Sequence, residues 1–248
     1  MAQSPNPSSW VKVSSDSHFS IQNLPYGVFE KANGDRHIGV AIGDHILDLY
    51  EVAKAGYFEK STHLAGGRSF LQRELNEFMG LGRPAWKEAR KIIQDLLSTE
   101  SKDKDRLFLE KECLVAQSQV KMQLPCKIHD YTDFYSSENH ASNVGKIIRP
   151  NEEPLKPNWK HLPVGYHGIA SSVVVSGTPI RRPVGQVICH FLCFVFVSPA
   201  QEGDLPTFTA CKLLDIELEL AFFVGGKCPP MGPPIKIADA YDYLFGVV

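Results

Sequence analysis

The sequence lacks the features that mark several large classes of protein. Its six cysteines include no CxxC pair and follow no regular spacing, which argues against a disulfide framework and favours reduced, buried thiols in a cytoplasmic protein. The first residues contain neither a basic stretch nor an apolar one, so we expect no signal peptide. The longest apolar run, residues 187–197, is interrupted by His190 and is shorter than the about 20 residues that cross a bilayer.

Other absences narrow the possible functions. The glycine pairs form neither a GxGxxG nor a Walker loop, and no GxSxG turn is present, so the sequence favours neither a nucleotide site nor a serine hydrolase. A formal net charge of -2 gives no electrostatic reason to bind nucleic acid or an anionic membrane, and we expect neither partner. The composition, 43% hydrophobic and 22% charged, is ordinary for a folded globular chain.

Three stretches of different character follow one another along the chain. Residues 1–20 are rich in Ser, Pro and Asn and are predicted to be flexible. Residues 21–124 are predicted to form an N-terminal domain, a small β-barrel with helices. The character changes near residue 125, beyond which Gly, Pro, Tyr and His are frequent. We therefore assign residues 125–248 to a second domain.

Local patterns predict the elements of these domains. Asn33-Gly34 and Gly43-Asp44 are turn signals between short strands and predict an antiparallel meander over residues 26–49. Pro84 suits the first turn of a helix, and apolar residues then recur at helical spacing up to Leu97. In the second domain, residues 172–176 read as a short strand.

An acidic segment near the C-terminus is a candidate metal site. Residues 213–224 read as a strand, which would place Asp215, Glu217 and Glu219 on one side. Two such carboxylates repel by about 3 kcal/mol at an effective dielectric near 20, unless water solvates them or a divalent cation lies between them. A solvated acidic face and a metal site are both compatible with this spacing, and the apolar residues that follow favour the metal site.

A second polar segment, residues 130–140, supplies further candidates. Asp133 lies between two tyrosines, where a carboxylate either caps the backbone locally or binds a ligand. His140 is either structural or a general base, because an unperturbed pKa of about 6.5 suits proton transfer at neutral pH. Downstream, Arg149 is either a surface residue or a carboxylate clamp. Tyr166, in the Gly- and Pro-containing loop 162–168, either packs in the loop or offers its hydroxyl to a substrate carboxylate.

Together these segments resemble the fumarylacetoacetate hydrolase family, in the form found in animals. The resemblance runs through nearly the whole chain, and the tyrosine-rich motif at residues 130–140 is highly specific. The matching stretches are residues 21–29, 38–49, 78–82, 130–145, 158–168, 173–183 and 210–224.

The resemblance implies a mainly β fold with some α, in which a small SH3-like barrel precedes an incomplete mixed β-roll, usually in a homodimer. It implies hydrolysis of the carbon–carbon bond of 4-fumarylacetoacetate, a small-molecule substrate of tyrosine and phenylalanine catabolism. By their matching positions, the resemblance implies that Asp133, Glu217 and Glu219 bind Ca²⁺ or Mg²⁺. It implies that Tyr135, Arg149 and Tyr166 contact the substrate, and that His140 is the catalytic base.

The sequence departs from the family pattern at three places. Ile169 stands where the family has an arginine, and the family continues past Val248 into a segment with another metal-binding aspartate. Residues 187–201 look inserted, and we interpret them as translated intron sequence rather than a membrane-contacting loop. Two interpretations therefore stay open: a hydrolase of this family, or a non-catalytic truncated or mis-spliced relative that at most binds metal weakly or pairs with full-length subunits.

Overall fold

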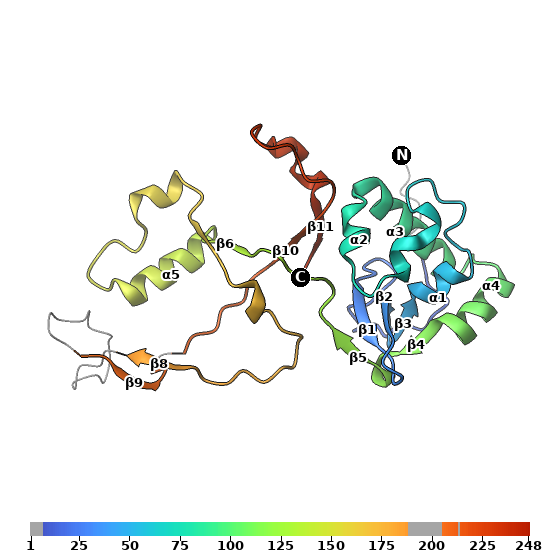
Figure 1. Cartoon of the computed structure of the whole chain (residues 1–248), viewed down its shortest axis with the longest axis horizontal. Coiled ribbons are helices and arrows are strands. Elements are labelled where there is room, and N and C mark those ends of the chain that lie inside the picture. The colour runs from blue at the N-terminus through green and yellow to red at the C-terminus, as the bar shows by residue number, and fades with distance from the viewer. Residues whose placement is uncertain (1–6, 188–204, 213) are drawn as a thin grey trace. The chain divides into compact units, whose positions relative to one another are not determined.

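A computed structural model of the chain describes residues 7–187, 205–212 and 214–248 (Figure 1). The chain divides into two compact units, one formed by Met1–Lys127 with Glu219–Val248 and the other by Ile128–Leu218. Strands with some helices make up the described chain, as the sequence predicts, and no closed barrel is present among the described residues. The segment interpreted as translated intron lies outside the described residues, apart from Val187 at its start.

The first unit is built on a five-stranded antiparallel sheet with the order β4-β3-β2-β1-β5. The predicted meander is confirmed, because β1, β2 and β3 follow one another through the turns at Gly34 and Gly43, whose positive φ angles of 86° and 54° suit glycine. The strands are β1 (Tyr26–Glu30), β2 (Arg36–Ile42), β3 (His45–Asp48), β4 (Leu114–Ala116) and β5 (Lys121–Gln123).

Helices lie beside this sheet (Figure 1). The predicted helix is confirmed as α3 (Arg83–Leu97), with proline in its first turn and its apolar side buried. The remaining helical elements of this part are α1 (Leu49–Lys54), η1 (Ala65–Leu71), α2 (Asn76–Gly80), α4 (Asp103–Phe108), η2 (Leu109–Cys113) and η3 (Gln117–Gln119).

An apolar core lies between the sheet and the helices. Phe58, Phe70 and Phe78 are fully buried, and the Phe70 ring meets the other two at tilted angles, with centroids 4.8 Å from Phe58 and 4.7 Å from Phe78. The start of the described chain joins this unit, because Trp10 Nε1 donates to the carbonyl of Leu96 at 2.8 Å and Val11 is buried. This part of the segment predicted to be flexible is therefore held against α3.

The C-terminal residues also belong to the first unit. They form β10 (Phe222–Val224) and β11 (Leu244–Val247), an antiparallel pair with the 3₁₀ helix η6 (Ile237–Asp242) between them. The strand predicted over residues 213–224 is wrong over most of its length, because residues 214–221 have no regular structure and only β10 forms.

The second unit consists of two-stranded sheets and one longer helix. Its elements are β6 (Thr132–Phe134), α5 (Glu138–Ile148), η4 (Pro157–Lys160), β7 (Gly165–His167), η5 (Ala170–Ser172), β8 (Val184–Val187) and β9 (Thr207–Ala210). The strand predicted at residues 172–176 is wrong, since the chain there leaves η5 into a turn. Among the described residues of this unit only Ala141 and Gly145, both on α5, are buried.

No described helix is at once long enough and apolar enough to cross a membrane.

Candidate active site and metal-ligating residues

Asp133 and Tyr166 face each other across a short antiparallel pair. They are direct partners in the β6–β7 register, and Tyr166 Oη donates to Asp133 Oδ2 at 2.9 Å. Adjacent cross-strand side chains on one face meet in this way because their Cβ atoms lie about 4.5–5.5 Å apart. Asp133 lies in the strand β6, where the Tyr166 hydroxyl orients its carboxylate.

Two glycines allow this pair of strands to approach closely. A Cβ atom at Gly165 would lie 2.6 Å from the carbonyl oxygen of Asp133, and one at Gly168 would overlap the ring of Tyr131. The pairing continues beyond the strands, where Tyr135 N donates to Val164 O at 2.8 Å. The loop predicted from its Gly and Pro content therefore shapes the backbone around Asp133.

Helix α5 positions His140. Ser137 caps the helix, and its hydroxyl accepts a hydrogen bond from the His140 backbone N–H at 3.3 Å. The rings of Tyr135 and His140 meet edge-on with centroids 5.6 Å apart. Tyr135 Oη donates to the carbonyl of Ala141 at 3.0 Å, so this tyrosine braces the first turn of the helix.

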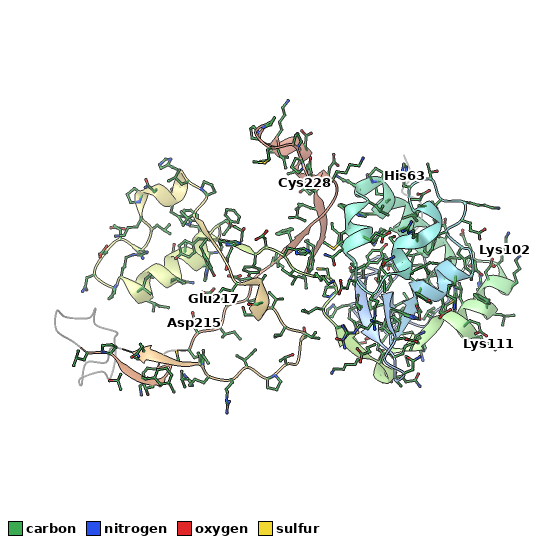
Figure 2. The ribbon with its side chains drawn as sticks, in the orientation of Figure 1. His63, Lys102, Lys111, Asp215, Glu217 and Cys228 are labelled. Carbon is green, nitrogen blue, oxygen red and sulfur yellow. The ribbon has the colours of Figure 1, made fainter. Side chains whose placement is uncertain are left out.

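Glu217 comes to His140 from far along the sequence. Its Oε1 lies 3.5 Å from His140 Nε2, and both side chains are partly exposed. Figure 2 shows Asp215 and Glu217 on the stretch without regular structure that precedes the C-terminal hairpin. Glu219 follows two residues later and belongs to the first unit. An imidazole beside a carboxylate is an arrangement that suits proton transfer or metal binding.

The apolar side chains on either side of Glu217 are exposed. Ile216 is 93% exposed and Leu218 is fully exposed. A strand buries an apolar face only against a partner layer, and residues 214–220 take part in no strand pairing. In this structure the acidic segment has no regular structure, and its apolar side chains are exposed to solvent.

Arg149 lies at the C-terminal end of α5. Its Nη2 donates to the carbonyl of Pro154 at 2.9 Å, while its buried Nε has no hydrogen-bond partner among the described residues. The guanidinium therefore keeps donor capacity beyond the loop it holds. Ile169, where the family pattern has arginine, is exposed.

An open pocket of about 520 Å³ lies beside Tyr135. Trp159, Lys160 and Leu162 contribute to its wall, together with residues on either side of Tyr135. Trp159 Nε1 also donates to the carbonyl of Tyr135 at 2.7 Å, which fixes the backbone at this wall.

Two contacts at this site were missed in the sequence. His167 Nε2 lies 3.0 Å from Asp130 Oδ1, which closes the β6–β7 pair next to Tyr166 and Asp133. Trp159 was missed as the residue that holds Tyr135. Asp130 and His167 both stood in the polar motifs singled out above, but only the pairing of the strands brings them together.

A separate group of ligand-type side chains lies in the first unit. Single ligand atoms of His37, Asp48 and Glu51 lie within 4.8 Å of one another. Lys31 Nζ already sits 2.7 Å from Asp48 Oδ2 and supplies the positive charge that a cation would bring. Asp48 also caps α1 through the backbone N–H groups of Tyr50 and Glu51, so this group is structural.

Burial and charge shift two pKa values near this group. Burial by itself would raise the pKa of Asp48, but hydrogen bonds from His37 and Lys31 outweigh it and lower the pKa below its usual value. Burial, followed by the charges of Asp48 and Glu51, raises the pKa of the Cys113 thiol to about 12. Cys113 is therefore an inert, protonated thiol. Of the other described cysteines Cys126 is buried, whereas Cys211 is half-buried and Cys228 is exposed, so the burial expected from the sequence holds only in part.

The predicted metal ligands are only partly brought together. Asp133 pairs with Tyr166 and Glu217 with His140, and Asp133 belongs to no group of three described metal-ligating residues with atoms within 4.8 Å. Carboxylate oxygens are nevertheless the donors that hard divalent cations prefer. The donor chemistry of these residues fits such a cation.

Comparison with known families defines the class of protein. The family model of the fumarylacetoacetase N-terminal domain matches residues 22–125, and that of the fumarylacetoacetate (FAA) hydrolase C-terminal domain matches residues 130–248. The chain belongs to the fumarylacetoacetate hydrolase family.

Within that family the chain is similar to the fumarylacetoacetases. It is 52% identical to the fumarylacetoacetase of Caenorhabditis elegans over 97% of this chain and 55% of that relative. It is 49% identical to that of Homo sapiens and 48% identical to that of Dictyostelium discoideum, each over 97% of this chain and 54% of the relative. The chain thus spans about half the length of the curated relatives it matches.

Proposed function

We propose that the chain contributes to the hydrolysis of the carbon–carbon bond of 4-fumarylacetoacetate, giving fumarate and acetoacetate. The observation that carries the proposal is the approach of His140 Nε2 to Glu217 Oε1, 3.5 Å, in a chain 52% identical to a fumarylacetoacetase. The similarity to named fumarylacetoacetases favours a hydrolase over the non-catalytic alternative.

Asp133, Glu217 and Glu219 are the proposed ligands of a divalent cation, Ca²⁺ or Mg²⁺. When bound, the cation supplies Lewis-acid polarisation of the substrate's keto oxygens and stabilises the charge on the leaving acetoacetate. The hydrogen bond from Tyr166 supports Asp133 in this role, because ligating carboxylates are usually oriented by a second hydrogen bond.

His140 is the proposed general base. Its imidazole takes a proton from water, whose oxygen attacks the carbonyl carbon next to the fumaroyl carbons. The bond to the acetoacetate carbon then breaks, and that carbon recovers a proton. The cap from Ser137 and the edge contact with Tyr135 hold the helix turn and ring in place during this transfer.

Tyr135, Arg149 and Tyr166 are the proposed substrate contacts. The pocket beside Tyr135 has room for a small dicarboxylate, and the half-buried Arg149 guanidinium has N–H donors besides the one held by Pro154 O. Tyr166 stands next to the proposed ligand Asp133, and its one hydroxyl proton, which it donates to Asp133, would turn to a substrate oxygen when substrate binds.

Further proposals concern the domain folds, the oligomeric state and the location of the protein. We extend the proposal to an SH3-like barrel for the N-terminal domain, a β-roll for the catalytic domain, a homodimer and a cytoplasmic location. The five-stranded antiparallel order of the sheet in the first unit supports the first of these. The reduced cysteines among the described residues support the last.

The test of the reaction compares His140→Ala with His161→Ala, which removes an exposed histidine outside α5. Cleavage of 4-fumarylacetoacetate is followed by product analysis with Ca²⁺ or Mg²⁺ added. We expect turnover by the chain and by His161→Ala, and a loss of about 10²-fold or more in His140→Ala. Absence of cleavage by the parent chain, or equal rates in both variants, would contradict the proposal.

The metal assignment is tested by calorimetry with Ca²⁺. Glu217→Ala is expected to weaken binding, whereas His140→Ala should leave it nearly intact because its role is to activate water. Affinity unchanged by Glu217→Ala would remove this residue from the metal site.

A further inference from the structure

The C-terminal hairpin anchors the chain directly after Glu219. Beyond the β10–β11 pairing, Ala221 N donates to Val248 O at 2.8 Å and Val248 N donates to Ala221 O at 2.9 Å. Ala221 is only two residues from Glu219, which itself lies in a stretch without regular structure. Glu219 therefore lies two residues before a pair of hydrogen-bonded strands. Contacts that hold these strands in place also hold the adjoining end of the acidic segment.

An aromatic cluster in the first unit receives Phe245 from β11. Its ring meets Trp86 of α3 at 5.2 Å with an interplanar angle of 80°, and Phe78 of α2 at 5.6 Å and 90°. The ring of Tyr26 on β1 lies 5.9 Å away. Edge-to-face pairs of this kind each contribute about 0.5–1.5 kcal/mol beyond their buried area. Phe245 thus fastens the hairpin to three elements of the N-terminal sequence.

A close backbone contact at Gly225 also holds the hairpin against α2 and α3. A Cβ atom on Gly225 would lie 2.7 Å from Met79 O and 2.8 Å from Trp86 Cζ2, so only glycine fits here without displacement. The neighbouring Gly226 N donates to Met79 O at 2.8 Å. The ion pair between Arg83 and Asp242, 3.1 Å, adds a weaker exposed contact.

The packing of the β10–β11 hairpin crosses the boundary between the two domains that the family models match. Residues 222–247 fall within the stretch matched by the C-terminal hydrolase domain, yet they pack with the residues matched by the N-terminal domain. The hydrolase segment that follows Glu219 therefore depends on α2, α3 and β1 for its position.

We propose that Phe245 and Gly225 are positioning residues: by docking the β10–β11 hairpin on the Tyr26–Phe78–Trp86 cluster, they fix the segment carrying Glu219 and thereby strengthen divalent-cation binding. The cation part of this inference rests on the proposed function. Positioning of this kind is significant because supporting contacts around metal ligands typically change affinity by about 10–100-fold.

The first measurement is hydrogen exchange at the amides of Ala221 and Val248, which needs no metal. Phe245→Ala and Gly225→Ala should each remove most of the protection there. Phe222→Ala and Gly246→Ala are matched controls in the same hairpin, since Phe222 is 54% exposed and a Cβ on Gly246 would meet nothing within 4 Å. Phe245→Leu keeps an apolar side chain at the cluster and should restore much of the protection. Protection that is unchanged in Phe245→Ala and Gly225→Ala would overturn the proposal.

The second measurement is Ca²⁺ affinity by calorimetry on the same full chain, with the exchange of Leu47 used to verify that the sheet is folded. Phe245→Ala and Gly225→Ala should weaken binding by about 10-fold, and the controls by less than about 2-fold. Folded variants with parental affinity would overturn the cation part. If the parent chain and Glu219→Gln both fail to bind Ca²⁺, the proposed metal assignment fails, and the exchange result alone decides whether the hairpin is docked as proposed.

Discussion

Asp48 Oδ2 lies 2.8 Å from His37 Nδ1, and both side chains are buried in the first unit. Lys31 Nζ approaches the same oxygen at 2.7 Å, while Asp48 Oδ1 accepts the Tyr50 N–H at 3.1 Å at the start of α1. One carboxylate thus joins β2, β3, α1 and the loop after β1. Removing it would leave the buried imidazole without its carboxylate and the Lys31 ammonium with only Glu51, whose Oε1 lies 4.0 Å away.

Asp48→Asn is expected to destabilise the chain by about 3–5 kcal/mol, because it breaks a buried ion pair from one side. The measurement is the free energy of unfolding from urea titration followed by tryptophan fluorescence. Asp95→Asn, which removes an exposed i,i+4 pair with Lys91, is the matched control and should cost no more than about 0.5 kcal/mol. Similar losses in the two variants would show that Asp48 does not organise this unit.

The lowered pKa of Asp48 predicts that stability falls in acid. Between its folded pKa and its unfolded value of about 3.9 the unfolded chain binds more protons, so its contribution is complete above the unfolded pKa and is lost as pH falls through the folded one. Urea midpoints from pH 7 to pH 3 measure this dependence. We expect the urea midpoint of Asp48→Asn to fall less steeply at acid pH than that of the parent. An equally steep fall would assign the loss of stability to other carboxylates.

Gly145→Ala is expected to loosen the second unit although alanine favours helices. A Cβ atom there would overlap the carbonyl of Pro154, so the loop after α5 must move at a cost of about 1–3 kcal/mol. Gly80→Ala, in α2 with nothing within 4 Å, should instead be neutral or stabilise by up to about 1 kcal/mol. Hydrogen exchange of the two helices measures both changes. Unchanged exchange of α5 in Gly145→Ala would contradict the packing described.

Tyr166→Phe is expected to weaken Ca²⁺ binding by about 10-fold, because it removes the hydroxyl that orients the proposed ligand Asp133. Tyr241→Phe, at an exposed tyrosine of the first unit, is the control and should bind as the parent does. Calorimetry of the two variants measures the difference. Equal affinities would leave the Tyr166 hydroxyl with a role in the β6–β7 pair or in substrate contact only.

Local sequence determined the elements that need only neighbouring residues. The Asn33-Gly34 turn predicts the β1–β2 hairpin because glycine adopts the required positive φ, observed at 86°. Proline followed by apolar residues at helical spacing predicts α3, whose buried side is the apolar one. The polar motifs also identified Asp133, His140 and Glu217 as residues to consider, since their side-chain chemistry is fixed by their identity.

Tertiary structure alone decided which of these residues meet. Alternation over residues 213–224 cannot show whether a partner strand is present. Without a partner strand, residues 214–220 have no regular structure, and Ile216 and Leu218 are exposed. His140 meets Glu217, and Arg83 meets Asp242 159 residues away, through packing that no local pattern encodes. The reason is physical: backbone turns and helices are selected by interactions within a few residues, whereas the partners of a side chain depend on how distant segments bury their surfaces together.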